Sequence, residues 1–349
     1  MKRLTLLPIL GCLLTALLFL PLPATAKGGY KSASAGSCHV VVLKEDGTLW
    51  GWGANWAGQL GDGPTTSRTS PVKILDGVKQ VSAGGNSTMA ILNDGTLWGW
   101  GGNLSGQLGD GTKTNCERPV KILDGVKQIS AGPFNTMAIL NDGSLWGWGV
   151  NYTGQLGDGT TTSRTRPVKI LDGVRQVAAG DGYTMAILND GTLWGWGYNE
   201  DGQLGDGTTT SRERPVKILD GVKQILAGRS NTMAILNDGS LWGWGGNYRG
   251  QLGDGTTTSR TRPVKILDGV KLVSGGAGNN ISHTMAILND GSLWGWGDNE
   301  FGQLGDGTKT ERHRPVKIAE NVKDVACGIS YTIYITENGE LMECGKLIW

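Results

Sequence analysis

The sequence predicts an all-β fold, a seven-bladed β-propeller of about 48-residue four-stranded repeats. Three observations predict this fold: a fixed repeat period, four short strand patterns per repeat, and small residues closing the first strand. The tetrapeptide Trp-Gly-Trp-Gly recurs in steps of 48 residues, once 52, starting at Trp50, Trp98, Trp146, Trp194, Trp242 and Trp294. Such a period is typical of arrays whose single repeats cannot bury their own hydrophobic face.

The repeat at residues 78–122 shows the expected elements in order. Its four strands are predicted at 78–84, 88–92, 97–101 and 119–122. They are short, rich in β-branched, apolar or aromatic residues, and follow no helical period. Asp94-Gly95 joins the second and third strands, and Asp-Gly between apolar runs is a strong hairpin signal because both turn residues need positive φ.

Side-chain size along the repeat favours a ring of blades. The first strand ends in Ser82, Ala83 and Gly84, as expected where inner strands crowd around an axis. In the third strand the two tryptophans share one face, so the indoles of one sheet can pack on the glycine-flattened face of the next. Twelve of the 14 tryptophans lie in these pairs, which predicts a core role for them.

The strand sets define one domain, predicted at residues 27–349. Blades are expected to start near residues 30, 78, 126, 174, 222, 270 and 322. The last blade is incomplete because it lacks the Pro-Val-Lys-Ile pattern of a fourth strand. Residues 346–349 either cap this blade or leave it with three strands.

The N-terminus predicts an export signal at residues 1–26. Lys2 and Arg3 precede an apolar stretch at 4–20, and Ala24-Thr25-Ala26 has the small-x-small pattern of a cleavage site. We therefore expect a secreted, periplasmic or cell-surface protein without stable membrane insertion after cleavage. An uncleaved anchor and a lipoprotein modified at Cys12 are the alternatives. Cleavage removes two cations from a net charge of +1, and the near-neutral product lacks the basic footprint of a nucleic-acid binder.

The sequence contains no recognisable catalytic, metal or nucleotide motif. The three histidines form no Ser-His-Asp order or HExxH, and no CxxC pair is present. The repeated Gly-Gln-Leu-Gly-Asp-Gly has no lysine in the phosphate-loop place and lacks the ligand spacing of a calcium loop. We therefore expect a protein that is not an enzyme and takes no cofactor or metal, and we expect a monomer.

Two cysteines suggest a clasp between the first and last blades. Cys327 replaces the alanine of the Ala-Gly motif in the seventh blade, and Cys38 lies just past that motif in the first. These blades are neighbours in a closed ring, so either a Cys38–Cys327 disulfide or two free thiols is expected there.

The repeat resembles that of the regulator-of-chromosome-condensation family. The resemblance rests on Ala83-Gly84, Asp94-Gly95, Trp100-Gly101, Asn103 and Gly106-Gln107-Leu108-Gly109, and it covers the whole mature chain. It implies a seven-bladed propeller. The family's founding members are exchange factors for the small GTPase Ran, a role that the export signal argues against in this chain. The chain is similar to secreted bacterial propellers, some of which inhibit β-lactamases by covering the enzyme with one face.

Two short windows vary among otherwise near-identical repeats, and they supply the candidate binding residues. One window follows Ala-Gly, and the other flanks the asparagine after Trp-Gly. In an antiparallel meander both loops emerge at the same end of the blade, so both windows are predicted on one face of the disc. The candidates are Trp56, Leu104, Phe134, Tyr152, Tyr183, Tyr198, Arg229, Tyr248, Arg249, His283, Phe301 and Tyr331.

This composition predicts a protein-binding face, because aromatic residues and arginine are enriched at binding hot spots. The expected function is a secreted propeller that binds another protein, with inhibition of an extracellular or periplasmic enzyme as one form. A lectin-like module is the alternative, in which Trp56, Tyr152 and Tyr248 stack on sugar rings. A structural module of the cell envelope is a further alternative.

Overall fold

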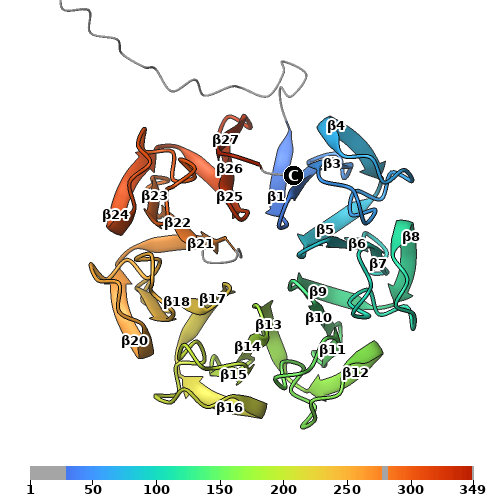
Figure 1. The fold of residues 1–349 in the computed structure, drawn as a ribbon, viewed down its shortest axis with the longest axis horizontal. Coiled ribbons are helices and arrows are strands. Elements are labelled where there is room, and N and C mark those ends of the chain that lie inside the picture. Colours follow the sequence, from blue (N-terminus) through green and yellow to red (C-terminus); the bar gives the residue numbers. More distant parts are fainter. Residues whose placement is uncertain (1–28, 277–281, 348–349) are drawn as a thin grey trace, which may run out of the picture.

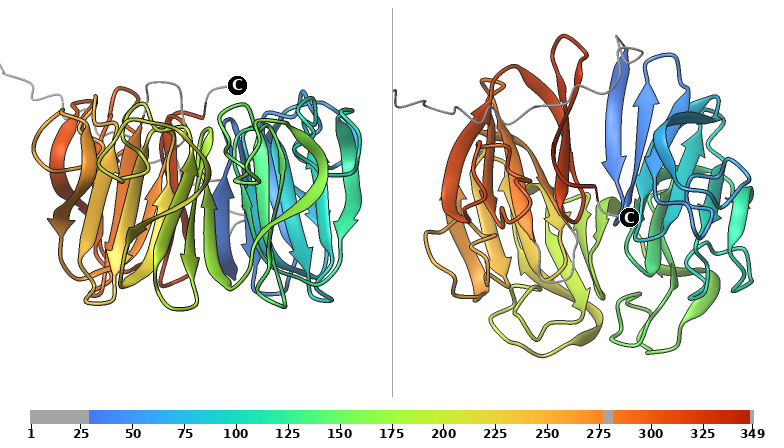
Figure 2. Two further views of the ribbon diagram at one scale, coloured as in Figure 1. Left: turned by 90° about the horizontal axis from the view of Figure 1, so that it is seen from below. Right: turned by 45° about the horizontal axis from the view of Figure 1, so that its top comes forward.

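The computed structural model describes residues 29–276 and 282–347, which form a closed ring of antiparallel sheets (Figure 1). The predicted export signal at 1–26 lies outside the described residues. Seen from the side, the ring is a disc with loops at both ends of the strands (Figure 2). This confirms the predicted all-β propeller. None of the described residues belongs to a helix long and apolar enough to cross a membrane.

Each of the first four blades contains four strands, numbered from the axis outward. Blade one comprises β1 (Tyr30–Ala35), β2 (His39–Lys44), β3 (Leu49–Gly53) and β4 (Arg68–Leu75). Blade two comprises β5 (Val78–Ala83), β6 (Ser87–Leu92), β7 (Leu97–Gly101) and β8 (Cys116–Leu123). Blade three comprises β9 (Val126–Ala131), β10 (Asn135–Leu140), β11 (Leu145–Gly149) and β12 (Arg164–Leu171). Blade four comprises β13 (Val174–Ala179), β14 (Tyr183–Leu188), β15 (Leu193–Gly197) and β16 (Arg212–Leu219).

The remaining blades follow the same order, but the last is shorter. Blade five comprises β17 (Val222–Ala227), β18 (Asn231–Leu236), β19 (Leu241–Gly245) and β20 (Arg260–Leu267). Blade six comprises β21 (Val270–Gly275), β22 (His283–Leu288), β23 (Leu293–Gly297) and β24 (Arg312–Ala319). Blade seven comprises β25 (Val322–Cys327), β26 (Tyr331–Thr336) and β27 (Leu341–Gly345). Among the described residues blade seven is therefore three-stranded, and its outer edge has no fourth strand.

The Asp-Gly hairpin is closed by the side chain of its aspartate. In blade two, Asp94 accepts hydrogen bonds from the backbone N–H of Thr96 at 2.9 Å and from its hydroxyl at 2.7 Å. Gly95 has a φ of 83°, in the left-handed region that glycine adopts without strain, whereas Asp94 does not have a positive φ. The expectation that both turn residues have positive φ is therefore wrong. The Thr96 hydroxyl accepts a hydrogen bond from the indole of Trp98, so the turn also fixes the first, half-buried tryptophan of the pair.

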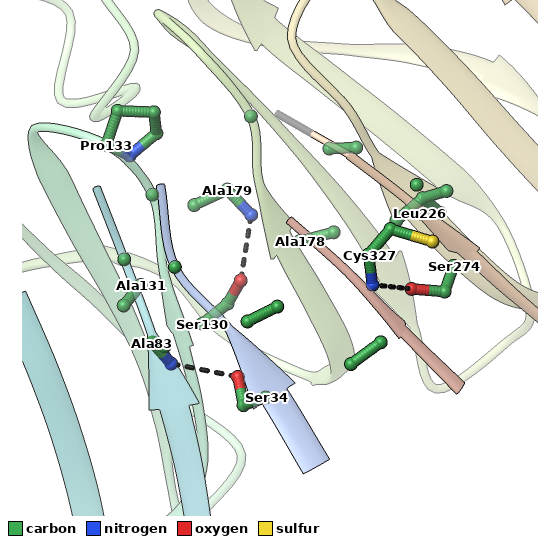
Figure 3. A pocket seen from close by; sticks show the side chains of 18 of the residues that line it. Ser34, Ala83, Ser130, Ala131, Pro133, Ala178, Ala179, Leu226, Ser274 and Cys327 are labelled. Carbon is green, nitrogen blue, oxygen red and sulfur yellow. Dashed lines mark hydrogen bonds between the residues drawn. The ribbon is translucent and has the colours of Figure 1, made fainter. Parts of the chain in front are cut away.

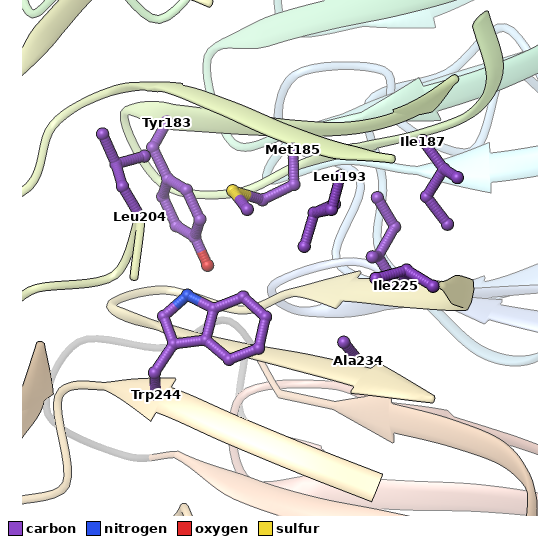
Figure 4. Close-up of a cluster of buried hydrophobic side chains, with 9 residues drawn as sticks. Tyr183, Met185, Ile187, Leu193, Leu204, Ile225, Ala234 and Trp244 are labelled. Atoms are coloured by element: carbon purple, nitrogen blue, oxygen red, sulfur yellow. The ribbon is translucent and has the colours of Figure 1, made fainter. Parts of the chain in front are cut away.

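The second tryptophan of each pair fills the space between blades, as Trp244 of blade five shows (Figure 4). It is fully buried against Tyr183, Met185 and Leu204 of blade four. Its indole N–H donates to the carbonyl of Gln203 at 2.9 Å. A Cβ on Gly205 would lie 2.6 Å from that indole nitrogen. The glycine under the indole is therefore that of the neighbouring Gln-Leu-Gly turn, and not a glycine of the Trp-Gly-Trp strand as the sequence suggested.

Small residues surround the axis, as the taper predicted. A central cavity of about 300 Å³ is lined mainly by alanine, serine and glycine of the inner strands (Figure 3). Serine hydroxyls link neighbouring inner strands there. Ser34 accepts from the backbone N–H of Ala83 at 2.9 Å, and Ser130 accepts from that of Ala179 at 3.0 Å.

Blades seven and one close the ring through polar contacts of buried groups. The Tyr331 hydroxyl donates to the backbone carbonyls of His39 at 2.9 Å and Gly36 at 3.2 Å. The backbone N–H of Ala33 donates to the Asp324 carboxylate at 3.0 Å.

The predicted Cys38–Cys327 clasp is not formed. Both cysteines are free thiols, as are Cys116 and Cys344. The chain thus joins its two end blades without sharing a strand between them and without a disulfide among the described cysteines.

Candidate protein-binding face

Both variable windows lie on one end of the disc, where they enclose a groove. The groove has a volume of about 610 Å³ and lies over blades three to five. Loops between first and second strands contribute Phe134 and Arg229, and loops between third and fourth strands contribute Tyr152 and Tyr248. We refer to this end of the disc as the variable face.

Five large apolar side chains are exposed among the described residues, and all five belong to the variable face. Their exposed fractions are 52% for Trp56, 74% for Leu104, 52% for Phe134, 74% for Tyr152 and 63% for Tyr248. Monomeric proteins seldom gather such side chains on one side without a binding role.

A buried asparagine holds four of these side chains outward. In blade two, the Asn103 amide donates to Asp110 at 3.0 Å, and its carbonyl oxygen accepts from the backbone N–H of Leu108 at 3.0 Å. The asparagine is thereby buried and fixed to its own loop, and the following residue, Leu104, projects into solvent. The same position in other blades carries Trp56, Tyr152 and Tyr248.

An ion pair stiffens the same loop in most blades. In blade three, the guanidinium of Arg164 donates to the Asp158 carboxylate at 2.6 Å and 3.0 Å. Asp158 also accepts from Asn151, which links the ion pair to the buried asparagine. The exposed side chains of the variable face therefore project from a rigid loop. Binding of a partner to them loses less conformational entropy than binding to a flexible loop would.

The groove brings six of the predicted residues together. They are Phe134, Tyr152, Tyr198, Arg229, Tyr248 and Arg249. Trp56, Leu104 and Phe301 belong to the same windows in blades one, two and six, but they do not line the groove.

Carboxylates that were not among the predicted site residues line the groove, as Asp181 and Asp201 do, or lie beside it. Asp181 lies 3.4 Å from Arg229, and Glu311 forms an ion pair with Arg249. The Tyr198 hydroxyl donates to Glu200 at 2.9 Å, and the Tyr248 hydroxyl donates to Asp201 of the neighbouring blade.

The carboxylates near the groove affect the pKa of Tyr198. Burial and the nearby carboxylates of Glu200 and Asp201 raise the pKa of Tyr198 to about 12. The signal that could have found these carboxylates was present in the sequence, because Asp181, Glu200 and Asp201 fall within the variable windows.

Three predicted binding residues are wrong, because they are buried between blades. Tyr183, His283 and Tyr331 have no exposed surface. The Tyr183 hydroxyl donates to the backbone carbonyl of Asn231 at 2.6 Å, and a 2.7 Å hydrogen bond joins His283 to Thr332. Each occupies the first position of a second strand, and the first five positions of these strands are buried on both faces of the sheet.

The described residues include no arrangement with metal-binding geometry. No three histidine, cysteine, aspartate or glutamate side chains among them are placed to hold a metal ion. Burial lowers the pKa of His39 to about 4 and that of His283 to about 3, so both imidazoles are neutral at pH 7. Burial raises the pKa of the Cys327 thiol to about 12, which makes it a poor nucleophile.

The fold and the repeat define a class of propellers, and comparison with known families identifies it. Residues 18–282 match the RCC1-like domain, and residues 274–303 and 290–335 match the regulator of chromosome condensation (RCC1) repeat. The chain therefore belongs to the family of RCC1-like propellers.

Curated relatives match over short segments. The ultraviolet-B receptor UVR8 of Arabidopsis thaliana is 38% identical over 68 residues, which are 18% of this chain and 16% of that receptor. Human protein RCC2 is 36% identical over 69 residues, 19% of this chain and 13% of that protein. Each match therefore covers less than a fifth of the relative's length.

Solved structures match along most of the chain. Human WBSCR16 has a TM-score of 0.79 at 24% identity, with 94% of this chain and 89% of that chain covered. Prp20p of Saccharomyces cerevisiae has a TM-score of 0.76 at 22% identity, with 91% and 83% covered. At these identities the similarity establishes the fold alone.

Proposed function

We propose that the protein is a binding module that engages another protein through its variable face. The observation that carries the proposal is the gathering of five large apolar side chains on that one face, beside a groove. Aromatic anchors on a rigid support, next to charged groups, are the composition of protein-binding hot spots.

Protein binding by relatives supports the proposal. Yeast Prp20p has binding properties to Gsp1p and histones, and it has also been crystallised bound to Kap60. The identity of a partner does not carry over, because the residues of the variable face are those in which the repeats differ most. The net charge of +1 gives no support to a nucleic-acid partner.

The more specific form of the proposal is an exported regulator that inhibits an extracellular or periplasmic enzyme. Its support is the signal-like pattern at residues 1–26 and the resemblance to secreted bacterial propellers. The groove offers arginines, tyrosines and carboxylates but no nucleophile with a paired base, which favours binding over catalysis.

Carbohydrate binding is the second candidate, and one observation favours it. Trp56, Tyr152 and Tyr248 occupy the same position of their repeats, as stacking platforms for a periodic sugar chain would. The other window residues differ from blade to blade, which favours one asymmetric protein partner.

Capture with matched variants tests the proposal. The mature chain would be immobilised beside a variable-face variant carrying Phe134→Ala, Tyr152→Ala and Tyr248→Ala. An opposite-face control would carry Lys121→Ala, Lys169→Ala and Lys217→Ala, three half-exposed residues near the crossings between blades. We expect one protein on the wild type and the control and none on the variable-face variant. Equal capture by all three, or retention of polysaccharide alone, would reject the proposal.

A further inference from the structure

The variable windows are uncharged in blades one to three and charged in blades four to six. In blades one to three, the windows at 37–39, 54–57, 85–87, 102–105, 133–135 and 150–153 contain no lysine, arginine, aspartate or glutamate. In blades four to six the windows contain five acidic residues and two arginines: Asp181, Glu200, Asp201, Arg229, Arg249, Asp298 and Glu300. Asp298 is buried, so a protein that covers the windows meets uncharged side chains over blades one to three and the other charged ones over blades four to six.

Partners within the chain already neutralise both arginines. Arg229 lies 3.4 Å from Asp181, and Arg249 is paired with Glu311. Glu200 and Asp201 form no ion pair with any described residue. Instead, Glu200 accepts a hydrogen bond from the Tyr198 hydroxyl, and Asp201 accepts one from the Tyr248 hydroxyl. In or beside the groove there are therefore two carboxylates that form no ion pair with a cation of the described residues.

The four side chains form a corner between blades four and five. Tyr198, Asp201 and Tyr248 all line the groove, and Glu200 stands exposed between Tyr198 and Asp201 in the chain. The tyrosine hydroxyls orient the carboxylates, and the tyrosine rings supply electron-rich faces. Carboxylates and aromatic faces together are the surroundings that best attract a lysine or arginine side chain.

We propose that the corner of Tyr198, Glu200, Asp201 and Tyr248 receives a lysine or arginine side chain of the protein partner, an inference that rests on the proposed function. The partner's basic residue pairs with Glu200 and Asp201 while apolar surface beside it covers Phe134 and Tyr152. The charged contact fixes the orientation of the partner on the face, and the apolar contact supplies most of the affinity.

A peptide titration tests the corner without a known partner. The probes are blocked pentapeptides of glycine with arginine, citrulline or glutamate at the centre, added at low salt to protein with labelled tyrosine rings. Tyr198→Phe and Tyr248→Phe assign the two ring signals. We expect saturable shifts of both with the arginine peptide only. The Glu200→Gln, Asp201→Asn double variant should weaken that binding about tenfold.

The control is Glu300→Gln, which removes an acid at the equivalent loop position of blade six, outside the groove. It should leave the titration unchanged. Absence of shifts with the arginine peptide, equal shifts with the glutamate peptide, or undiminished binding in the double variant would overturn the proposal.

A captured partner separates this inference from the proposed function. Binding that is lost in the variable-face variant but unaffected by Glu200→Gln and Asp201→Asn at low and high salt would refute the basic contact alone. Capture that ignores the variable face would refute the proposed function. The peptide titration measures binding at the corner directly, so its result does not depend on which protein is captured.

Discussion

At the scale of single residues, the variable windows contain two kinds of position that look alike in the sequence. The residue after the buried asparagine, such as Tyr152, projects into solvent because the asparagine is tied to its own loop. The residue that opens the second strand, such as Tyr183, shares the core face with Met185 two positions on. Both positions vary, but only the first belongs to the variable face.

The two buried histidines make stability depend on pH. Burial lowers the pKa of His39 to about 4 and that of His283 to about 3, well below the value in an unfolded chain. Between about pH 6.5 and those values the unfolded chain binds protons that the folded chain does not. As the pH is lowered below about 6.5, the unfolding free energy should therefore decrease by about 1.4 kcal/mol per pH unit for each histidine.

Urea unfolding between pH 7 and pH 4 measures this slope. His283→Gln should reduce it, because glutamine can keep a hydrogen bond to Thr332 and does not titrate. Identical slopes in wild type and His283→Gln would show that the buried imidazole is not the titrating group.

Nine of the twelve predicted site residues lie on the variable face, and the three that do not, Tyr183, His283 and Tyr331, all open a second strand. Extending the alternation of Met185 and Ile187 backward by two positions would have assigned Tyr183 to the core. The tyrosine–carboxylate contacts between blades four and five depend on packing across blades, which a single sequence does not encode in its spacing.

At the scale of elements, blade seven has a smaller side chain at one core position, Cys344, and a larger one at another, Tyr334, than the other blades have. Cys344 stands where the other blades have the second, buried tryptophan, and its thiol donates to the carbonyl of Gln303 as the indole does elsewhere. Tyr334 stands where blade six has Ala286, and its ring packs with Leu304 of blade six. A small residue in place of tryptophan is thus offset by a large one in place of alanine.

A double-mutant cycle tests this exchange. Tyr334→Ala should cost about 3 kcal/mol of unfolding free energy because it leaves a cavity. Cys344→Trp should cost about 2 kcal/mol because it crowds the tyrosine. The two together restore the pair found in blade six and should cost clearly less than the sum. Strict additivity in chemical denaturation would show that the positions do not share space.

The repeat period predicted these elements well because each blade restates the same strand and turn signals. The Asp-Gly turns, the paired tryptophans and the small inner residues all occur where the sequence indicated. The partner of the indole was misassigned because Gly205 contacts Trp244 across a blade boundary, and such a contact leaves no periodic trace within one strand.

At the scale of the whole molecule, ring closure relies on side-chain contacts. Blade seven lacks a fourth strand and Cys38 and Cys327 are unpaired, so side-chain contacts join blade seven to blade one. Asp324 of β25 accepts from β1, and Tyr331 of β26 donates to β2. The two junctions of blade seven, with blade six and with blade one, differ from the others because this blade has three strands among the described residues.

Asp324 is the residue at which closure can be tested. Burial raises its pKa, so its negative charge costs stability while its oxygen satisfies the Ala33 N–H. Asp324→Asn keeps an acceptor and should raise the unfolding free energy at pH 7. Asp324→Ala leaves the N–H without that partner and should lower it by about 1 kcal/mol. Thermal unfolding of both variants measures these changes. Equal destabilisation by the two would show that the Asp324 oxygen does not stabilise the junction by accepting the Ala33 N–H.

The central claim is that the variable face binds a protein partner, and one measurement tests it most directly. The dissociation constant of the captured protein would be compared among the wild type, the variable-face variant and the opposite-face control. Loss of Phe134, Tyr152 and Tyr248 should weaken binding by about a hundredfold or more, as for a cluster of hot-spot side chains. The opposite-face control should bind as the wild type does. Equal dissociation constants for the wild type and the variable-face variant would contradict the account.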